Sequence, residues 1–156
     1  MRKLALVAAL LLVLIPLASE GASAPSPWVA TWMLDAAHSK VAPNRPTGVS
    51  LQFLQADAAM IKYALSFTTP QGQALTSNYA GKPDGKPHPA TINGQEISQV
   101  AYSWKSPRVL HGEVTQKNGT QEVLEMTIAA DGKSITETRH MKAPGSEEET
   151  LIFRRK

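Results

Sequence analysis

Glu137 and Arg139 are the two residues of this sequence whose types and spacing offer the clearest chemistry. They alternate with threonines in a run typical of a β-strand, so both side chains share a face with Ile135 and Met141. If that face points into the protein, Arg139 could bind a ligand carboxylate or phosphate through a forked pair of hydrogen bonds. If the opposite face points inward, the pair lies in solvent, where charged side chains are usually found. The orientation of this strand therefore decides whether the interior has a polar anchor.

Aromatic side chains occupy the apolar rows of other alternating segments, namely Tyr63, Phe67, Tyr79, Tyr102 and Trp104. Directed inward, they would form the wall of a cavity for an apolar or ring-shaped ligand. A small barrel can also be filled by its own side chains, in which case the same aromatics are plain core. We predict a ligand-binding role for these five residues together with Arg139, and keep the filled core as the alternative.

Catalytic and metal-binding patterns are missing from the sequence. The four histidines, His38, His88, His111 and His140, show none of the close spacings of a local metal site. No Gly-x-Ser-x-Gly nucleophile elbow occurs, and Ser39-Lys40 is only a dipeptide at the end of a turn. We therefore predict no catalytic residue, no metal and no cofactor, and we rank an enzyme with acid–base groups in the cavity last.

The segments that position these side chains alternate apolar and polar residues with a period of two, the pattern of β-strands. Residues 61–67 are the clearest example. We expect further strands at 28–34, 49–53, 75–79, 100–104, 110–114, 124–128, 135–141 and 150–154. Residues 82–89 contain three prolines and indicate a turn or an edge. Glu147-Glu148-Glu149 is interpreted as a solvated acidic loop.

Two dipeptides predict tight hairpin turns, Asn118-Gly119 and Asp131-Gly132. The first also begins a glycosylation acceptor, Asn-Gly-Thr, but we favour the turn. Sequential hairpins favour an all-β, up-and-down antiparallel barrel of eight to ten strands, because closure removes the exposed sheet edges. A two-layer β-sandwich is the alternative.

Residues 1–24 have the three parts of a secretory signal peptide: Arg2 and Lys3, an uncharged run over 4–18, and small residues ending at Ala24. The uncharged run is shorter than the ~20 residues of a membrane-spanning helix. We expect a signal helix that is cleaved after Ala24 or Gly21, a spacer over 25–27, and a single domain over 28–156. The domain is expected in the periplasm or outside the cell, with no stable membrane anchor.

Composition narrows the class of partner. The chain has no cysteine, which excludes lipid attachment after the leader and leaves the domain without disulfides. Lys and Arg exceed Asp and Glu by only 16 to 13 and are scattered apart from the last three residues. Nucleic-acid binding requires clustered positive charge, so nucleic acid is excluded as a partner. Nothing in the pattern indicates a particular protein partner.

Trp32 near the start of the domain and Arg154 near its end resemble the lipocalin pattern. In that pattern an arginine stacks on the tryptophan and closes one end of the barrel; here Ala30 replaces the usual glycine before the tryptophan.

More of the chain resembles a group of small exported bacterial proteins of unknown function that are described as lipocalin-like. The shared segments are Trp32-x-Leu34-Asp35 with Ser39-Lys40, residues 84–89 (Asp-Gly-Lys-Pro-His-Pro), and residues 131–136 (Asp-Gly-Lys-Ser-x-Thr). This resemblance implies a barrel and an envelope or extracellular location, and it implies no activity.

We therefore predict an exported, non-catalytic barrel that binds a small apolar ligand in its mouth. Tyr63, Phe67, Tyr102 and Trp104 form the wall in this hypothesis, and Arg139 is the polar anchor. The alternative is an envelope protein-interaction or structural module with a filled barrel.

Overall fold

The computed structural model describes residues 26–156 apart from residue 44, so the predicted signal peptide lies outside the described residues. The described chain forms ten strands and one short 3-10 helix, η1 (Ala36–His38). The strands are β1 (Thr31–Leu34), β2 (Thr47–Ala56), β3 (Ile61–Thr68), β4 (Ala74–Gly81), β5 (His88–Ile92), β6 (Gln95–Ser106), β7 (Val109–Gln116), β8 (Gln121–Ile128), β9 (Ser134–Met141) and β10 (Glu149–Arg155). Nowhere in this described part is there a helix that is long and apolar enough to cross a membrane.

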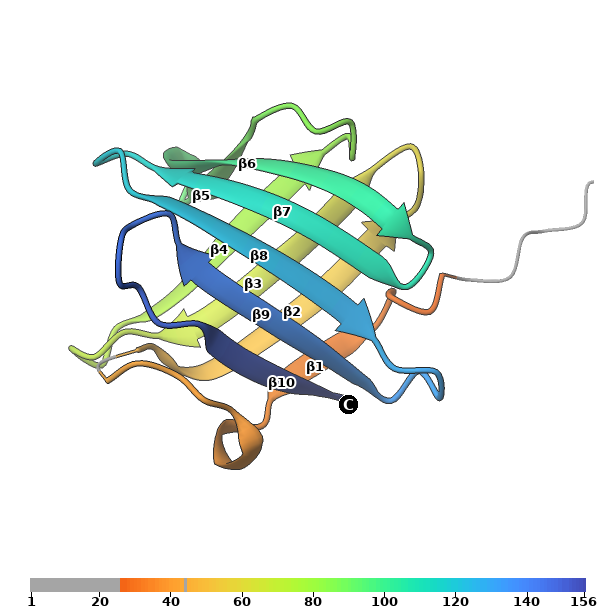
Figure 1. Cartoon of the computed structure of the whole chain (residues 1–156), viewed down its shortest axis with the longest axis horizontal. Coiled ribbons are helices and arrows are strands. Elements are labelled where there is room, and N and C mark those ends of the chain that lie inside the picture. Colours follow the sequence, from red (N-terminus) through yellow and green to blue (C-terminus); the bar gives the residue numbers. More distant parts are fainter. Residues whose placement is uncertain (1–25, 44) are drawn as a thin grey trace, which may run out of the picture.

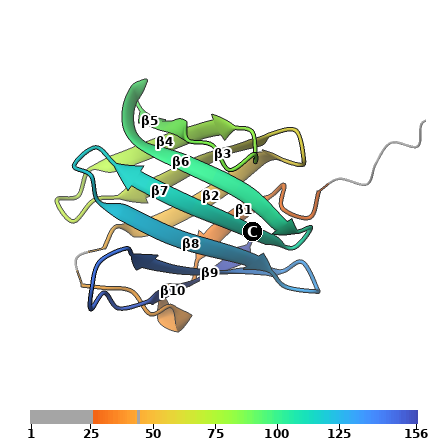
Figure 2. The ribbon, with the colours of Figure 1, turned by 45° about the horizontal axis from the view of Figure 1, so that its top comes forward.

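The strands form one closed antiparallel barrel. From β2 to β10 each strand pairs with the next along the chain, and β1 pairs with both β2 and β10. Figures 1 and 2 show β7, β8 and β9 on one side of the barrel and β2, β3 and β4 on the opposite side. Closure leaves no free sheet edge. The predicted up-and-down barrel is confirmed, and the sandwich alternative is wrong.

The two predicted hairpin turns connect β7 to β8 and β8 to β9. Gly119 and Gly132 have φ angles of 86° and 68°, the left-handed region that glycine adopts without strain. The preceding side chains stabilise each turn, because Asn118 Oδ1 accepts a hydrogen bond from the amide of Thr120 and Asp131 Oδ1 accepts one from Lys133, each at 3.0 Å. Both predictions are confirmed.

Strand β5 was not expected, because its first two residues belong to the proline-containing segment interpreted as a turn or an edge. His88 and Pro89 instead pair with Val100 and Gln99 of β6. The pairing between β4 and β5 covers only Ala90 to Ile92, so Pro89 lies beyond it. A proline there costs no hydrogen bond between β4 and β5, which explains why the strand tolerates it.

One end of the barrel, which we call the closed end, is filled by aromatic side chains. Trp28 and Trp32 are almost completely buried, and Trp32 Nε1 donates a hydrogen bond to the Trp28 carbonyl at 2.9 Å. The Trp28 ring packs edge-to-face on Phe53 and on Trp104, with centroids 5.7 and 5.4 Å apart. The residues before β1 therefore fold under the barrel and seal this end.

The arginine that covers Trp32 is Arg155, whose guanidinium carbon lies 5.5 Å from the centre of the indole. Arg154 was expected in this place, and the structure corrects that expectation. Alternation along β10 gives Arg155 the same orientation as the buried Phe153, whereas Arg154 points outward and contacts Asp35. The contact between tryptophan and arginine is thus present, one residue later than expected.

Candidate functional site

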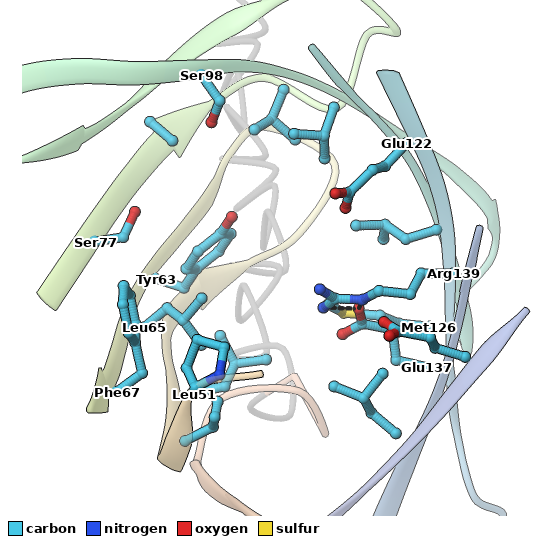
Figure 3. A pocket seen from close by; sticks show the side chains of 18 of the residues that line it. Leu51, Tyr63, Leu65, Phe67, Ser77, Ser98, Glu122, Met126, Glu137 and Arg139 are labelled. Atoms are coloured by element: carbon cyan, nitrogen blue, oxygen red, sulfur yellow. Dashed lines mark hydrogen bonds and ion pairs between the residues drawn. The ribbon is translucent and has the colours of Figure 1, made fainter. Parts of the chain in front are cut away.

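The barrel contains a cavity of about 300 Å3 beyond its aromatic closed end. This volume is at the lower end of the range of small-molecule sites, roughly 300–1,000 Å3. Most of the wall is apolar, and its residues include Leu34, Val49, Leu51, Leu65, Phe67, Ile97, Val100, Val114, Leu124, Met126, Leu151 and Phe153 (Figure 3). The barrel is therefore filled at one end and hollow toward the other.

The hollow end, which we call the mouth, opens near the β1–β2 connection and the β9–β10 connection. A second hollow of about 440 Å3 lies there, and it shares Arg45, Glu122, Arg139 and Glu149 with the cavity. Because they share these residues, the two hollows lie side by side and join at the mouth. A small molecule entering between the two connections would pass charged side chains before it reached the apolar wall.

Four of the six residues expected to bind a ligand line the cavity: Tyr63, Phe67, Tyr102 and Arg139. Tyr79 and Trp104 are not among the lining residues, and this corrects their expected placement. Both lie one step closer to the closed end along their strands, where Tyr79 is buried and Trp104 is partly buried. The Tyr79 ring stacks behind Tyr63 at 5.3 Å, and Trp104 Nε1 donates a hydrogen bond to the carbonyl of Asp57 at 3.0 Å.

The tyrosines form a cluster at the base of the cavity. The hydroxyls of Tyr63 and Tyr102 are hydrogen-bonded at 3.2 Å, and Tyr79 packs edge-to-face on Tyr102. Burial raises the pKa of Tyr63 to about 12, and it also raises the pKa values of Tyr79 and Tyr102. These hydroxyls therefore stay protonated near neutral pH and can donate hydrogen bonds, but they are poorly suited to act as bases.

Glu137 and Arg139 both point into the barrel, so Thr136 and Thr138, which alternate with them, face outward. Glu137 is only 1% exposed, and it lies opposite the inward-facing Leu151 of β10. Arg139 donates a hydrogen bond from Nε to Glu137 Oε1 at 2.6 Å, and its Nη2 contacts the same oxygen. Burial acts to lower the pKa of Arg139, but the adjacent Glu137 carboxylate outweighs burial and the pKa is raised. The interior thus contains a charged pair whose partners neutralise each other.

Glu149 is buried, which corrects the interpretation of residues 147–149 as a solvated loop. It begins β10 opposite Arg139, so its side chain turns inward. The carboxylate accepts hydrogen bonds from the amide of Ala42 at 2.8 Å and from Arg45 Nε and Nη2 at 2.9 and 2.6 Å. Burial acts to raise the pKa of Glu149, but these hydrogen bonds outweigh it and the pKa lies below its usual value. Glu149 therefore ties the β1–β2 connection to the mouth.

Besides Glu149, five polar residues that line the cavity were missed from the sequence: Arg45, Ser77, Ser98, Gln116 and Glu122. Figure 3 shows the two serines on the wall opposite Glu122 and Arg139. Alternation could have located Glu122, because it continues the inward row of Leu124 and Met126. The cavity is thus mainly apolar, and four of its five charged residues, Glu122, Glu137, Arg139 and Glu149, lie on β8–β10.

The histidines do not line the cavity itself, and His140 lines the second hollow at the mouth. His38 contacts Asp35 at 2.8 Å, His88 contacts Asp84 at 3.4 Å, and His111 Nε2 is 3.9 Å from Glu113. Among the described residues, which are 26–156 except residue 44, no group of three or more His, Asp or Glu side chains could hold a metal ion.

Ser39 has a structural contact. Its hydroxyl donates to the Asp35 carbonyl at 2.7 Å and accepts from the amide of Ile152 at 2.9 Å. This serine therefore fastens the turn after β1 to β10.

Comparisons with known proteins found no matching family model and no matching curated protein. Among solved structures, the chain is similar to a redesigned β-barrel, mFAP1, bound to DFHBI, with 12% identity, a TM-score of 0.44, and coverage of 83% of this chain and 95% of that one. It is also similar to EF1p2_mFAP2b bound to DFHBI, with 11% identity, a TM-score of 0.44, and coverage of 83% and 94%. At this level of similarity, neither structure indicates a ligand for this chain.

Proposed function

We propose that this barrel binds a small, largely apolar molecule non-covalently in its cavity. The observation that carries the proposal is the cavity itself, about 300 Å3 with mostly apolar walls in a barrel of this size. A purely structural barrel of ten strands could fill this space with its own side chains, as the closed end does around Trp28. The hollow also continues into the mouth, which gives a ligand a way in.

The walls suit a flat or branched apolar body. Leu65, Phe67 and Val100 offer apolar contacts, and the tyrosine cluster closes the base next to Tyr63. A ligand that buries about 200 Å2 of apolar surface gains on the order of 5 kcal/mol. Loss of translational and rotational freedom offsets much of this gain. Binding by the apolar wall alone would therefore be weak, and the polar groups of the cavity must add affinity and selectivity.

A direct test uses N-phenyl-1-naphthylamine, a neutral apolar dye whose fluorescence rises in apolar surroundings. We expect saturable binding of one dye molecule per chain. Leu65→Trp would fill the cavity, because Leu65 lines it, and should weaken binding at least tenfold. Ala64→Trp is the matched control, since Ala64 is the next residue on β3 and does not line the cavity. Absence of saturable binding, or equal loss in both variants, would contradict the proposal.

Export is the second part of the proposal, and it rests on the composition of residues 1–24. The test is intact-mass analysis of the protein purified from its own host together with fractionation of the cells. A chain beginning at Pro25 or Ala22 in the periplasm or medium is expected. A full-length chain in the cytoplasm would contradict it.

A further inference from the structure

The charged side chains that line the cavity carry more negative than positive charge. They comprise three carboxylates and two guanidiniums: Glu122, Glu137, Glu149, Arg45 and Arg139. The cavity therefore has an excess of one negative charge. Charges inside a partly buried space interact more strongly than charges in water, so this excess favours some ligands over others.

Both guanidiniums already have carboxylate partners. Arg139 binds Glu137 through Nε and Nη2, and Arg45 binds both carboxylate oxygens of Glu149. Glu122 is the carboxylate left over. Within the part of the chain that the structure describes, the Glu122 side chain forms neither an ion pair nor a hydrogen bond.

The outer part of the mouth does not supply the missing positive charge. Lys40 is the additional cation there, and its Nζ lies 3.9 Å from Glu147 Oε2. Glu148 also lines this hollow. The second hollow thus adds two carboxylates, one ammonium group and the imidazole of His140. With the imidazole neutral, the excess of negative charge extends from the cavity to the opening.

Glu122 is well placed to meet a ligand that rests on the apolar wall. It lies on β8 in the same inward row as Leu124 and Met126, nearer the mouth than either. Figure 3 shows its carboxylate directed into the cavity from the wall that also carries Arg139. Glu122 is thus next to both the apolar lining and the opening.

From this geometry we propose that the preferred ligand carries a protonated amine or a similar cationic group, which binds Glu122 while the apolar body fills the cavity. This inference rests on the proposed ligand binding. A cation at Glu122 would neutralise the unpaired charge. A ligand carboxylate or phosphate would instead have to compete with Glu137 for Arg139, and it would meet the negative charge of Glu122. Arg139 is therefore a partner of Glu137 and not the anion anchor that its residue type suggested.

The test compares three probes with the same naphthalene body and different polar groups: 1-naphthylmethylamine, 1-naphthylmethanol and 1-naphthoate. Calorimetric titration at neutral pH should give the amine the highest affinity and naphthoate the lowest. A charged hydrogen bond to Glu122 corresponds to a preference of roughly tenfold for the amine over the alcohol. Added salt should reduce this preference.

Glu122→Gln should lower the affinity for the amine to about that for the alcohol and so abolish the preference, and a circular dichroism spectrum like that of the wild type would show that the variant is folded. The matched control is Glu125→Gln, because Glu125 lies on the same strand, pairs with Lys105 at 2.6 Å and does not line the cavity. This variant should retain the preference.

The outcomes separate the two proposals. Equal affinities for amine and alcohol, or tightest binding of naphthoate, would overturn the cation preference and leave ligand binding in place, provided that Leu65→Trp blocks the binding. If none of the three probes binds, ligand binding fails and the cation preference fails with it.

Discussion

Arg45 and Glu149 are 104 residues apart in the sequence and are joined at the mouth by two hydrogen bonds of 2.9 and 2.6 Å. The Ala42 amide also donates to the same carboxylate. The β1–β2 connection is thereby held against the first residue of β10. Because Glu149 is buried, the loss of its charge would leave these donors without a strong acceptor.

The first prediction concerns Glu149 and pH. The pKa of this carboxyl is lowered in the folded state, so its stabilisation is complete above the ordinary value of 4.5 and is lost as pH falls through the folded value. Glu149→Gln should lower the free energy of unfolding at neutral pH by about 1–3 kcal/mol. Its unfolding free energy should also decrease less than that of the wild type between neutral pH and a pH well below 4.5. Urea unfolding measures both effects, and the exposed Glu96→Gln should show neither.

The second prediction concerns the three tyrosines, which are all the tyrosines of the chain. Their pKa values are raised by burial, and that of Tyr63 is raised to about 12. The stabilisation from keeping them protonated is complete below the ordinary value of 10.0 and is lost as pH rises through the folded values.

The measurement is an ultraviolet titration of tyrosine ionisation. The native protein should show no ionisation near pH 10.0, and ionisation should coincide with alkaline unfolding followed by circular dichroism. In concentrated guanidinium chloride all three tyrosines should titrate near their ordinary value. A native protein with one tyrosine that ionises near pH 10.0 would contradict the buried cluster.

The third prediction concerns the closed end. Arg155 lies over Trp32, and its guanidinium also donates to the carbonyls of Gly132 and Val29 at 3.3 and 3.4 Å. Arg155→Ala should lower the free energy of unfolding by about 1 kcal/mol, mainly through loss of the cation–π contact. Arg154→Ala removes an exposed side chain and should cost less than about 0.5 kcal/mol. The reverse order in urea unfolding would show that the stabilising arginine is misassigned.

The fourth prediction concerns Gly112, which faces the tyrosine cluster from β7. A Cβ atom at this position would lie 2.7 Å from Tyr102 Cε1 and 2.9 Å from Leu124 Cδ1. Gly112→Ala should therefore overpack the interior and lower the free energy of unfolding by about 1–3 kcal/mol. The double variant with Tyr102→Leu should cost less than the sum of the two single variants, because the smaller side chain makes room. Additive costs would show that the two residues are not in conflict.

The sequence predicted the barrel because its signals are local. Alternation over residues 61–67 places Tyr63, Leu65 and Phe67 inward as observed, and Asn118-Gly119 encodes a turn by backbone conformation alone. Each of these features depends on neighbouring residues.

The features that escaped prediction depend on distant pairings. Glu149 looks solvated among three consecutive glutamates, and only its contact with Arg45 shows that it is buried. Tyr79 and Tyr63 both lie in inward-facing rows of their strands. Packing near the closed end separates Tyr79 from the cavity, whereas Tyr63 lines it. The residue type of Arg139 also could not show whether this side chain is free to bind a ligand. Its hydrogen bond to Glu137 forms because both side chains turn inward.

The pairing of β1 with β10 has a consequence for how the chain folds. Every other strand pair joins neighbours along the chain, so each can form as a local hairpin at a small cost in loop entropy. The pairing of Trp32 with Arg155 instead joins the two ends of the domain. Among the strand pairs, this seam has the greatest sequence separation, and closing it should be the slow step of folding. Substitutions in the seam should then slow folding, since its contacts form in the rate-limiting step.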